Sequence, residues 1–411
     1  IEYKVYRINK DMFLRRRFCK RVALLSVAIS LFFYLSILLF GDLRAPKILN
    51  LTNLHRCPAC YGISVCPELY SGQITLDWGT WASLFNAKNI FYGFTKSNRR
   101  IILKKLAHNW EIEEFDSKMC EAFKLNSNCK PKHLLNVTNL NELLLNVVYY
   151  NYTLPDTAPR KGLVMCPYAY SLYDLIHPLQ NSKDSQTDMI NIWTMLSINP
   201  EPIILQVLKK SLGWPVPAYG GVCGRVEVVA HEGESLSSYS QVAWHKKLKY
   251  AKKILEAAMD FTFKHDRFRF YLMDWSLDNI VANEKDEITF VDLEDLIVLD
   301  KHISPGKDLP HWYQRYSRDI TGPGFTFSIE NMCKHHLSDH NLWAACYILA
   351  GDEEPFLYPI PDQINNSRPD LNTLLKDCVE GNNRFKTITT LQHILTDILM
   401  DEKLLGLNSV R

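Results

Sequence analysis

The sequence contains no internal repeat, and 17 glycines and 19 prolines in 411 residues are too few for a collagen-like or low-complexity chain. Beyond residue 21, the sequence also lacks an excess of basic residues. Residues 1–21 hold eight Lys or Arg and two acidic residues, a net charge of +6, whereas the remaining 390 residues carry −4. This balance argues against nucleic acid as a partner. With 47% hydrophobic and 22% charged residues, the composition is that of a globular protein.

A long run without charged residues is present at 22–40 (VALLSVAISLFFYLSILLF), just long enough to cross a bilayer core as a helix. A basic cluster at 15–21 precedes it, so the positive-inside rule places 1–21 in the cytosol and 41–411 in the lumen or outside the cell. No clean cleavage site follows the run, which favours an uncleaved signal anchor over a signal peptide. Met12 would make a natural start, and later release by proteolysis stays open.

Cysteines and glycosylation sequons support the lumenal assignment. Cys19 alone precedes the uncharged run, and an even number of cysteines follows it, as a disulfide framework requires. These are Cys57, Cys60, Cys66, Cys120, Cys129, Cys166, Cys223, Cys333, Cys346 and Cys378. The Asn-x-Ser/Thr sequons on the same side are Asn50, Asn136, Asn151 and Asn365. We therefore expect a type II glycoprotein of the secretory pathway.

Two cysteine clusters also invite a metal interpretation. Cys57-Pro-Ala-Cys60 with Cys66 has zinc-like spacing but no evident fourth ligand, and an oxidising lumen favours disulfides. The stretch from Cys333 to Cys346 includes three histidines, and a helix tied by a disulfide is the simpler interpretation.

Residues 243–263 have apolar side chains at three- and four-residue steps, which predicts an amphipathic helix. A strand at 270–273 and a hairpin, 280–283 with 288–291 around the turn 284–287, are predicted to follow. If 283 pairs with 288, Asn279 lies opposite Asp292 at the open end of the hairpin. With Asp274 nearby, these side chains supply the hard oxygen ligands that Mg²⁺ takes.

An Asp, an Asn five residues later and an Asp after one short hairpin form the pattern of the protein kinase catalytic core. Asp274 would then accept the proton of the attacking hydroxyl, while Asn279 and Asp292 hold the metal of Mg²⁺- or Mn²⁺-ATP. An ordinary surface hairpin with acidic ends is the alternative. Several kinase features are missing: Leu272-Met273 replaces HR, Asp292-Leu293-Glu294 replaces DFG, and no APE or G-x-G-x-x-G motif occurs. A phosphate lid would have to lie within 72–94.

The nucleotide-binding lysine is sought upstream. Arg100 to Lys104 (RIILK) resembles the strand motif V-A-I-K, so Lys104 is predicted to face the phosphates. A solvated lysine at a strand end is the alternative, with Lys105 as a competitor. A helix is predicted at 107–123, with Glu111 as the acid that holds Lys104 and Glu114–Lys118 as a surface pair. A strand at 225–229 and the linker to Gly233 are placed where a kinase has its hinge.

Several segments resemble the divergent protein kinase domain 2 group, the deleted-in-autism protein type, among secretory-pathway kinase-like proteins. They are Cys57-Pro-Ala-Cys60-Tyr-Gly with Cys66, Asn199-Pro-Glu-Pro202, Gly213-Trp-Pro215, Cys223-Gly-Arg225, Tyr271-Leu-Met-Asp274 with Asp278-Asn279, Val291-Asp292 and Asp339-His-Asn341. The resemblance implies an α+β, bilobal kinase-like fold with disulfide-rich additions, Golgi or ER residence and possible secretion. The expected regions are a tail at 1–21, an anchor at 22–40, a stem at 41–70, an N-lobe with an insertion at 71–230 and a C-lobe at 231–411.

Three functions are compatible with these observations. The first is a lumenal ATP-dependent kinase acting on secretory proteins or glycans, which Lys104, Asp274, Asn279 and Asp292 together favour. The second is a pseudokinase that acts as a secreted or anchored binding protein, with a cell-surface receptor as its partner. The third is a type II Golgi glycosyltransferase, in which the D-x-E at 292–294 would bind a nucleotide sugar. The hairpin and the D-x4-N spacing argue against the third.

Overall fold

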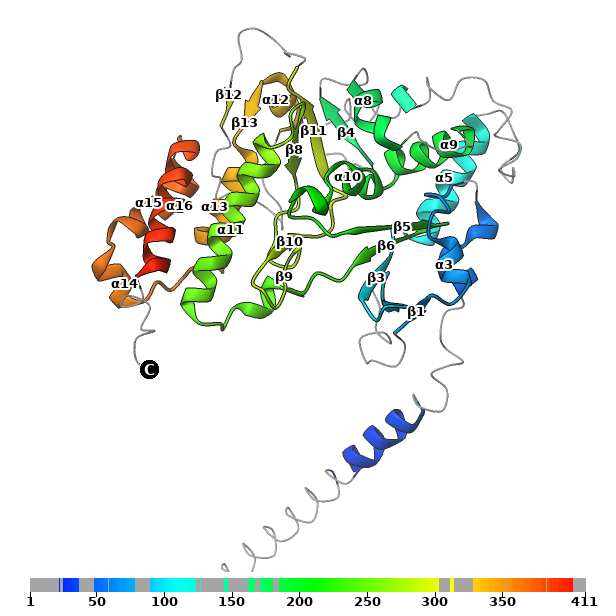
Figure 1. Cartoon of the computed structure of the whole chain (residues 1–411), viewed down its shortest axis with the longest axis horizontal. Helices are drawn as coiled ribbons and strands as arrows, with labels where there is room; N and C mark the ends of the chain where they lie inside the picture. Colours follow the sequence, from blue (N-terminus) through cyan, green and yellow to red (C-terminus); the bar gives the residue numbers. More distant parts are fainter. Residues whose placement is uncertain are drawn as a thin grey trace, which may run out of the picture.

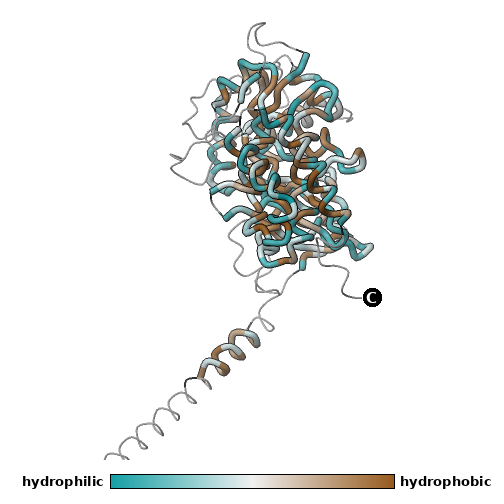
Figure 2. Tube along the Cα trace, turned by 90° about the vertical axis from the view of Figure 1, so that its left-hand side faces the viewer, coloured by the Kyte–Doolittle hydropathy of each residue, from teal (hydrophilic) through white to brown (hydrophobic). Residues whose placement is uncertain are grey.

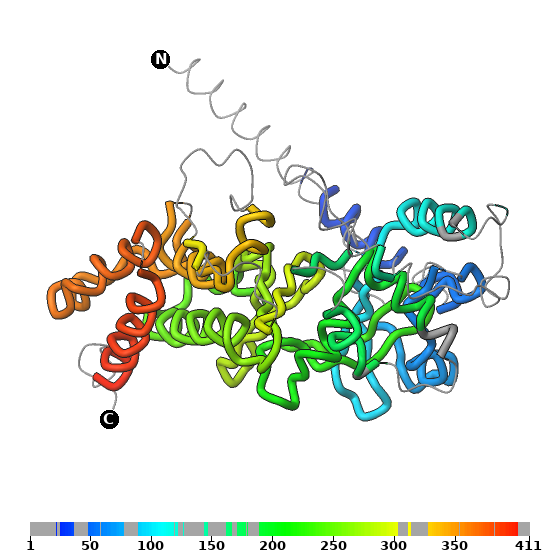
Figure 3. Tube along the Cα trace, turned by 90° about the horizontal axis from the view of Figure 1, so that it is seen from above, coloured from blue at the N-terminus to red at the C-terminus, as the bar shows by residue number. Residues whose placement is uncertain are grey.

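The computed structural model describes residues 22, 25–36, 48–57, 59–77, 89–122, 126, 144–146, 162–166, 171–179, 185–302, 311–313, 328–352, 354–381 and 383–401. Two regions make up the body: a sheet region around one antiparallel sheet, and a helical region that holds the C-terminal helices at the opposite end (Figures 1 and 3).

The sheet region contains five strands in the order β1-β2-β3-β6-β5, and all neighbours pair antiparallel. They are β1 (Ile74–Leu76), β2 (Ile90–Thr95), β3 (Arg100–Lys105), β5 (Tyr219–Cys223) and β6 (Val226–Ala230). Ile101 and Leu103 of β3 are buried in a small core, so alternation turns Ile102 and Lys104 to the other face. On β6, Glu227 lies directly opposite Lys104. The strand predicted to end in Lys104 is therefore confirmed.

Residues 48–70, expected to form a stem, pack instead against this sheet. They form α2 (Ile48–Thr52), the 3-10 helix η1 (Leu54–Arg56) and α3 (Cys66–Tyr70). The Val65 N–H donates to the carbonyl oxygen of Val222 at 3.1 Å, and a disulfide joins Cys66 to Cys223. Leu51, Val65 and Leu69 share the small core with β3 and β6, where burial removes their apolar side chains from water. The segment thus belongs to the sheet region.

The residues between β3 and α10 form an insertion that reaches both regions (Figure 1). Its described elements are α5 (Asn109–Ala122), β4 (Val164–Cys166), α8 (Leu172–Ile176), η3 (His177–Leu179) and α9 (Ser185–Ser197). In the sheet region, Asp116 of α5 pairs with the buried Arg225 at 2.6 Å. In the helical region, β4 pairs parallel with β11, and Cys166 is bonded to Cys333. The insertion therefore contacts both regions, through an ion pair in the sheet region and through a disulfide in the helical region.

The helical region is built around α11 (Trp244–Phe263), which confirms the predicted amphipathic helix. Leu248, Ala251, Leu255 and Ala258 are fully buried, and the lysines lie on the opposite side. Around α11 are η5 (Leu236–Tyr239), α12 (Ile329–Lys334), α13 (His340–Ala350), α14 (Asp362–Ser367), α15 (Asp370–Glu380) and α16 (Arg384–Met400). Short strands complete the region: β7 (Glu234–Ser235), β8 (Phe268–Leu272), β9 (Ile280–Ala282), β10 (Ile288–Phe290), β11 (Leu296–Asp300), β12 (His311–Trp312) and β13 (Leu337–Ser338). Between the regions lie α10 (Glu201–Val207) and η4 (Lys210–Leu212).

Gly233 connects the two regions after β6. Its φ is 130°, and a Cβ atom there would lie 1.9 Å from the carbonyl oxygen of Ala282. Because only glycine fits so close to another backbone, the linker predicted after the 225–229 strand can pass directly beside β9. Strand β7 then pairs with β9.

The hairpin of β9 and β10 is confirmed, but the predicted register is wrong by one residue. Ala282 pairs with Ile288, and Asn283 with Glu287, so the turn is shortened to 284–286. Oδ1 of Asn283 stabilises this shorter turn by accepting hydrogen bonds from the backbone N–H groups of Lys285 and Glu287. Asn279 therefore lies opposite Val291, and Asp292 is the next residue. Asp292 has a φ of 65°, a conformation that a residue with a side chain adopts only under local constraint.

The expectation of paired cysteines is confirmed for the described residues. The disulfides are Cys57–Cys60, Cys66–Cys223, Cys166–Cys333 and Cys346–Cys378. Cys120 is also disulfide-bonded, whereas Cys19 and Cys129 lie outside the described residues. Neither cysteine cluster is left to bind zinc. Of the sequons, Asn50 and Asn365 are exposed, whereas Asn136 and Asn151 lie outside the described residues.

Part of the predicted anchor is described, namely residue 22 and the helix 25–36, which is coloured largely hydrophobic in Figure 2. The large apolar side chains of this helix are exposed. Among the helices that the structure describes, none combines the length and the apolar character needed to span a bilayer. The rest of 22–40 and the tail 1–21 lie outside the described residues.

Candidate active site

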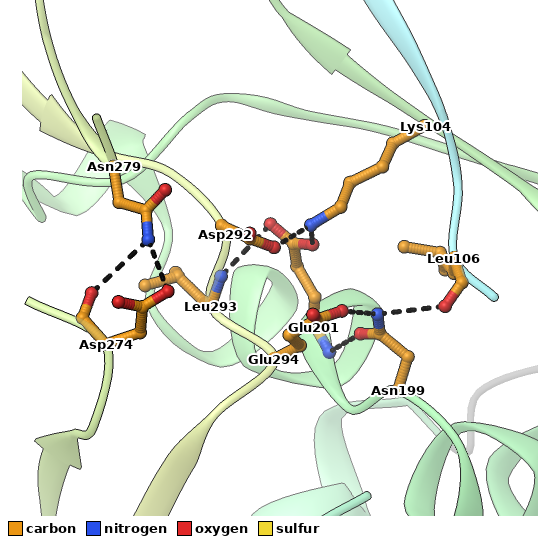
Figure 4. A network of polar contacts seen from close by, with 9 residues as sticks. All are labelled: Lys104, Leu106, Asn199, Glu201, Asp274, Asn279, Asp292, Leu293 and Glu294. Carbon is orange, nitrogen blue, oxygen red and sulfur yellow. Dashed lines mark hydrogen bonds and ion pairs between the residues drawn. The ribbon is translucent and has the colours of Figure 1, made fainter. Parts of the chain in front are cut away.

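Lys104, near the end of β3, points toward two carboxylates that come from distant parts of the chain (Figure 4). Its Nζ lies 2.6 Å from Oε2 of Glu201, the first residue of α10, and also donates to Oδ1 of Asp292. Burial would lower the pKa of Lys104, but the two carboxylates outweigh burial and raise the pKa above its ordinary value. Lys104 is thus held as a cation at the centre of the site.

The prediction that Glu111 holds Lys104 is wrong, because Glu201 has this position. Glu111 lies in the first turn of α5, where Oε2 accepts a hydrogen bond from the His108 N–H at 2.8 Å, as in a capping box. The predicted helix around Glu111 and the surface pair Glu114–Lys118, at 2.7 Å, are both confirmed. The helix that carries the true partner begins only after the insertion.

A sequence signal for Glu201 was available in Asn199-Pro-Glu-Pro202. Proline is common in the first turn of a helix, where its missing N–H has no role, so this motif marks a helix start with an acid in that turn. Glu201 is buried, and its second oxygen, Oε1, accepts a hydrogen bond from the Leu293 N–H at 3.3 Å. Glu201 therefore connects Lys104 to the segment that follows Asp292.

Asp274 and Asn279 lie on the other side of Asp292 (Figure 4). Nδ2 of Asn279 donates to Oδ2 of Asp274 at 2.7 Å. Partial desolvation, followed by the nearby Asp292 and Asp278, raises the pKa of Asp274, while the hydrogen bond from Asn279 opposes this shift. A raised pKa brings the Asp274 carboxylate closer to the basicity that a general base needs.

Glu294, in place of the kinase glycine, adds another buried acid. Burial and the neighbouring Asp292 raise its pKa to about 8. Glu227 is fully buried beside Lys104 on the sheet, and burial, together with Glu201, holds its pKa well above the ordinary range. With a pKa of about 8, Glu294 favours the uncharged acid at neutral pH, which limits the negative charge around Lys104.

A cavity of about 690 Å³ opens onto these residues. Lys104, Asn279 and Asp292 line it together with further acids and with Lys105 and His108. The lining acids are Glu111, Asp274, Asp278, Asp292, Glu294 and Asp295. So acidic a cavity repels a phosphate group unless a cation accompanies it.

The donor atoms fit a hard divalent cation. Asp292 offers a carboxylate, and since the amide nitrogen of Asn279 faces Asp274, its amide oxygen is directed elsewhere (Figure 4). In the parts of the chain that the structure describes, no three or more His, Cys, Asp or Glu side chains are arranged to hold a metal ion by themselves. A cation here would take phosphate oxygens and water as its remaining ligands, as Mg²⁺ commonly does.

The fold and this set of side chains define a protein-kinase-like domain of mixed helices and sheets. A family model described as "Protein-kinase domain of FAM69" matches residues 192–381, a range that includes Glu201, Asp274, Asn279 and Asp292 but not Lys104.

Curated relatives extend the likeness to most of the chain. The chain is 30% identical over 378 residues to "Divergent protein kinase domain 2A" of Xenopus tropicalis. The matched stretch covers 84% of this chain and 87% of the relative. The human protein of the same name is 28% identical over 362 residues, 81% of this chain and 83% of that protein. "Divergent protein kinase domain 2B" of Mus musculus is 24% identical over 188 residues, 42% of this chain and 43% of that protein. The chain belongs to the divergent protein kinase domain 2 family.

Proposed function

We propose that this protein transfers the γ-phosphoryl group of Mg²⁺- or Mn²⁺-ATP to a hydroxyl group of a secretory-pathway protein or glycan. The observation that carries the proposal is the convergence of Lys104, Glu201 and Asp292 beside Asp274 and Asn279 in one cavity. Phosphoryl transfer depends mainly on positioning and on stabilising charge, and these residues supply both.

Each side chain has a distinct role in this proposal. Asp292 and Asn279 would hold the divalent cation, whose chemistry is to neutralise charge on the phosphate oxygens. Lys104, kept in place by Glu201, would contact the phosphates. Asp274 takes the proton of the acceptor hydroxyl as that oxygen bonds to the γ-phosphorus and the bond to the β-phosphate oxygen breaks, with ADP as the leaving group.

The proposed location is the lumen of the ER or Golgi, with 22–40 as the membrane anchor and release from the cell as a further step. Several features support it. The described disulfides need an oxidising compartment, Asn50 and Asn365 are exposed sequons, and the apolar side chains of 25–36 are exposed.

A pseudokinase that binds a receptor is the second candidate. The direct contact between Lys104 and Asp292 favours it, because the lysine then covers an oxygen that the metal would need. Residues 77–89 join the short strands β1 and β2, and Gly79 is the one glycine in this segment of the sequence. The segment therefore lacks the glycine-rich motif with which kinases cover the phosphates.

A thermal-shift titration of the purified protein with ATP and Mg²⁺ or Mn²⁺ separates the two candidates, since a ligand that binds only the folded state raises its stability. We expect a metal-dependent rise in melting temperature for the wild type and none for Asp292→Ala, which should stay folded. No shift with any nucleotide or metal would favour the pseudokinase.

A further inference from the structure

Asn199 is fully buried just before α10, and its side-chain amide contacts three separate elements (Figure 4). Nδ2 donates to the carbonyl oxygen of Leu106, after β3, at 3.2 Å, and also to Oε2 of Glu294. Oδ1 accepts a hydrogen bond from the Glu201 N–H at 3.0 Å. One amide thus joins the end of β3, the start of α10 and the segment that follows Asp292.

We propose that Asn199 is a positioning residue for the metal–nucleotide complex: it holds Glu201 against Lys104 and holds the 292–294 segment against α10. This inference rests on the proposed function and adds a residue that touches neither nucleotide nor metal. Asn199 acts through Glu201 and Glu294.

The chemistry of the contacts requires an amide. Two N–H groups and one oxygen are all used, and among short side chains only asparagine offers this set. Aspartate keeps the acceptor for Glu201 but loses both donors and adds a carboxylate beside Glu294. Because the site is buried, each partner left without a hydrogen bond incurs its full desolvation cost.

The contact also bears on how the site is kept assembled. In protein kinases the lysine–glutamate pair depends on the position of the helix that carries the glutamate, which activation-loop phosphorylation controls. Here Leu272 and Met273 stand where the kinase pattern has HR. Asn199, together with the Glu201–Leu293 hydrogen bond, fixes α10 directly to the 292–294 segment.

The first test is the dissociation constant of Mn²⁺-ATP for the full-length protein, measured by isothermal titration calorimetry. We expect Asn199→Asp to raise the dissociation constant about tenfold, the effect of losing one to two buried hydrogen bonds. Asn341→Asp is the matched control. Asn341 is also fully buried, and it makes hydrogen bonds with Thr262, Phe270 and Leu272 in the helical region. It should destabilise the fold comparably while leaving the dissociation constant within about twofold of the wild type.

The second test exchanges the two groups. In the double variant, Asn199→Asp with Glu294→Gln, the new amide can donate to the new carboxylate. The loss of binding free energy in the double variant should therefore be smaller than the sum of the losses in the two single variants. Strictly additive effects, or equal binding by wild type and Asn199→Asp, would overturn the positioning role while leaving the proposed function intact. A folded wild type that binds no Mn²⁺-ATP would overturn the proposed function and this inference with it.

Discussion

The site has two halves that are assembled in different ways. The buried half takes its name from the buried Asn199 and Glu201, and it also includes Lys104, Asp292 and Glu294, which line the cavity. It is joined by contacts between residues far apart in the sequence, such as Lys104 with Glu201 and Asp292. The open half, Asp274 and Asn279, is joined by hydrogen bonds from Nδ2 of Asn279 to the backbone oxygen and to Oδ2 of Asp274, five positions earlier, and both side chains line the cavity. The difference indicates that the pairing of Lys104 with its carboxylates depends on the whole fold, whereas the proposed base Asp274 and the proposed metal ligand Asn279 are brought together by one short segment.

The largest effect should come from removing the cation of the buried half. Lys104→Met leaves the carboxylates of Glu201 and Asp292 without a positive partner, and breaking a buried pair in this way costs about 3–5 kcal/mol of unfolding free energy. Urea denaturation at pH 7.5 measures the loss.

Lys105→Met is the control for this change. Lys105 is the adjacent lysine, and its Nζ makes an exposed hydrogen bond with Oδ1 of Asn109. We expect a loss of about 1 kcal/mol or less. Equal losses for the two lysines would contradict the distinction between the buried cluster and the rest of the sheet.

Within the open half, Asp274 should affect chemistry and not binding. Asp274→Asn removes the group that accepts the hydroxyl proton, so phosphoryl transfer should fall about 10²- to 10⁴-fold. The affinity for Mn²⁺-ATP should stay near that of the wild type because Asp292 is unchanged. Parallel measurements of turnover and of nucleotide affinity check this, and an equal fall in both would show that Asp274 belongs to the binding half.

A smaller effect concerns the pH dependence of the buried half. The pKa of Glu294 is raised to about 8, so the folded state binds its proton more tightly than the unfolded state, whose glutamates titrate near 4.5. This contribution to stability is complete below pH 4.5 and is lost as the pH rises to about 8, by at most about 1.4 kcal/mol per pH unit. Lys104, Glu201, Asp292 and Asp295 surround the group.

Glu294→Gln should flatten this part of the pH profile, since glutamine has no proton to lose. Melting temperatures of wild type and variant between pH 5 and 9 provide the comparison. Parallel profiles would mean that Glu294 is ionised throughout.

The smallest effect is expected on the surface of α5. Glu114→Gln removes an exposed pair with Lys118, and such pairs on helices contribute about 0.2–0.5 kcal/mol. Chemical denaturation at low and high salt should reveal a difference only at low salt. A loss of unfolding free energy above about 1 kcal/mol would contradict the interpretation of Glu114–Lys118 as an exposed surface pair.

The same two halves explain which site residues could be predicted. Asp274, Asn279 and Asp292 follow from short spacings around one hairpin, and the structure brings them together even though the register differs by one residue. Glu201 was missed because the partner of Lys104 was sought in the next helix along the chain. The insertion separates Lys104 from α10, so that Glu201 follows 97 residues later. Asn199 was read as part of a motif without a role, because its role depends on contacts with Leu106 and Glu294.

By itself, the sequence determined the features that depend on near neighbours: the period of α11, the strand that ends at Lys104, the hairpin before Asp292 and the expectation of paired cysteines. Tertiary structure alone decided that Cys166 bonds to Cys333, that 48–70 packs on the sheet and that Glu201 meets Lys104. The physical reason is that periodicity and turn residues specify which face of an element is buried, whereas the partner it meets there depends on the path of the whole chain.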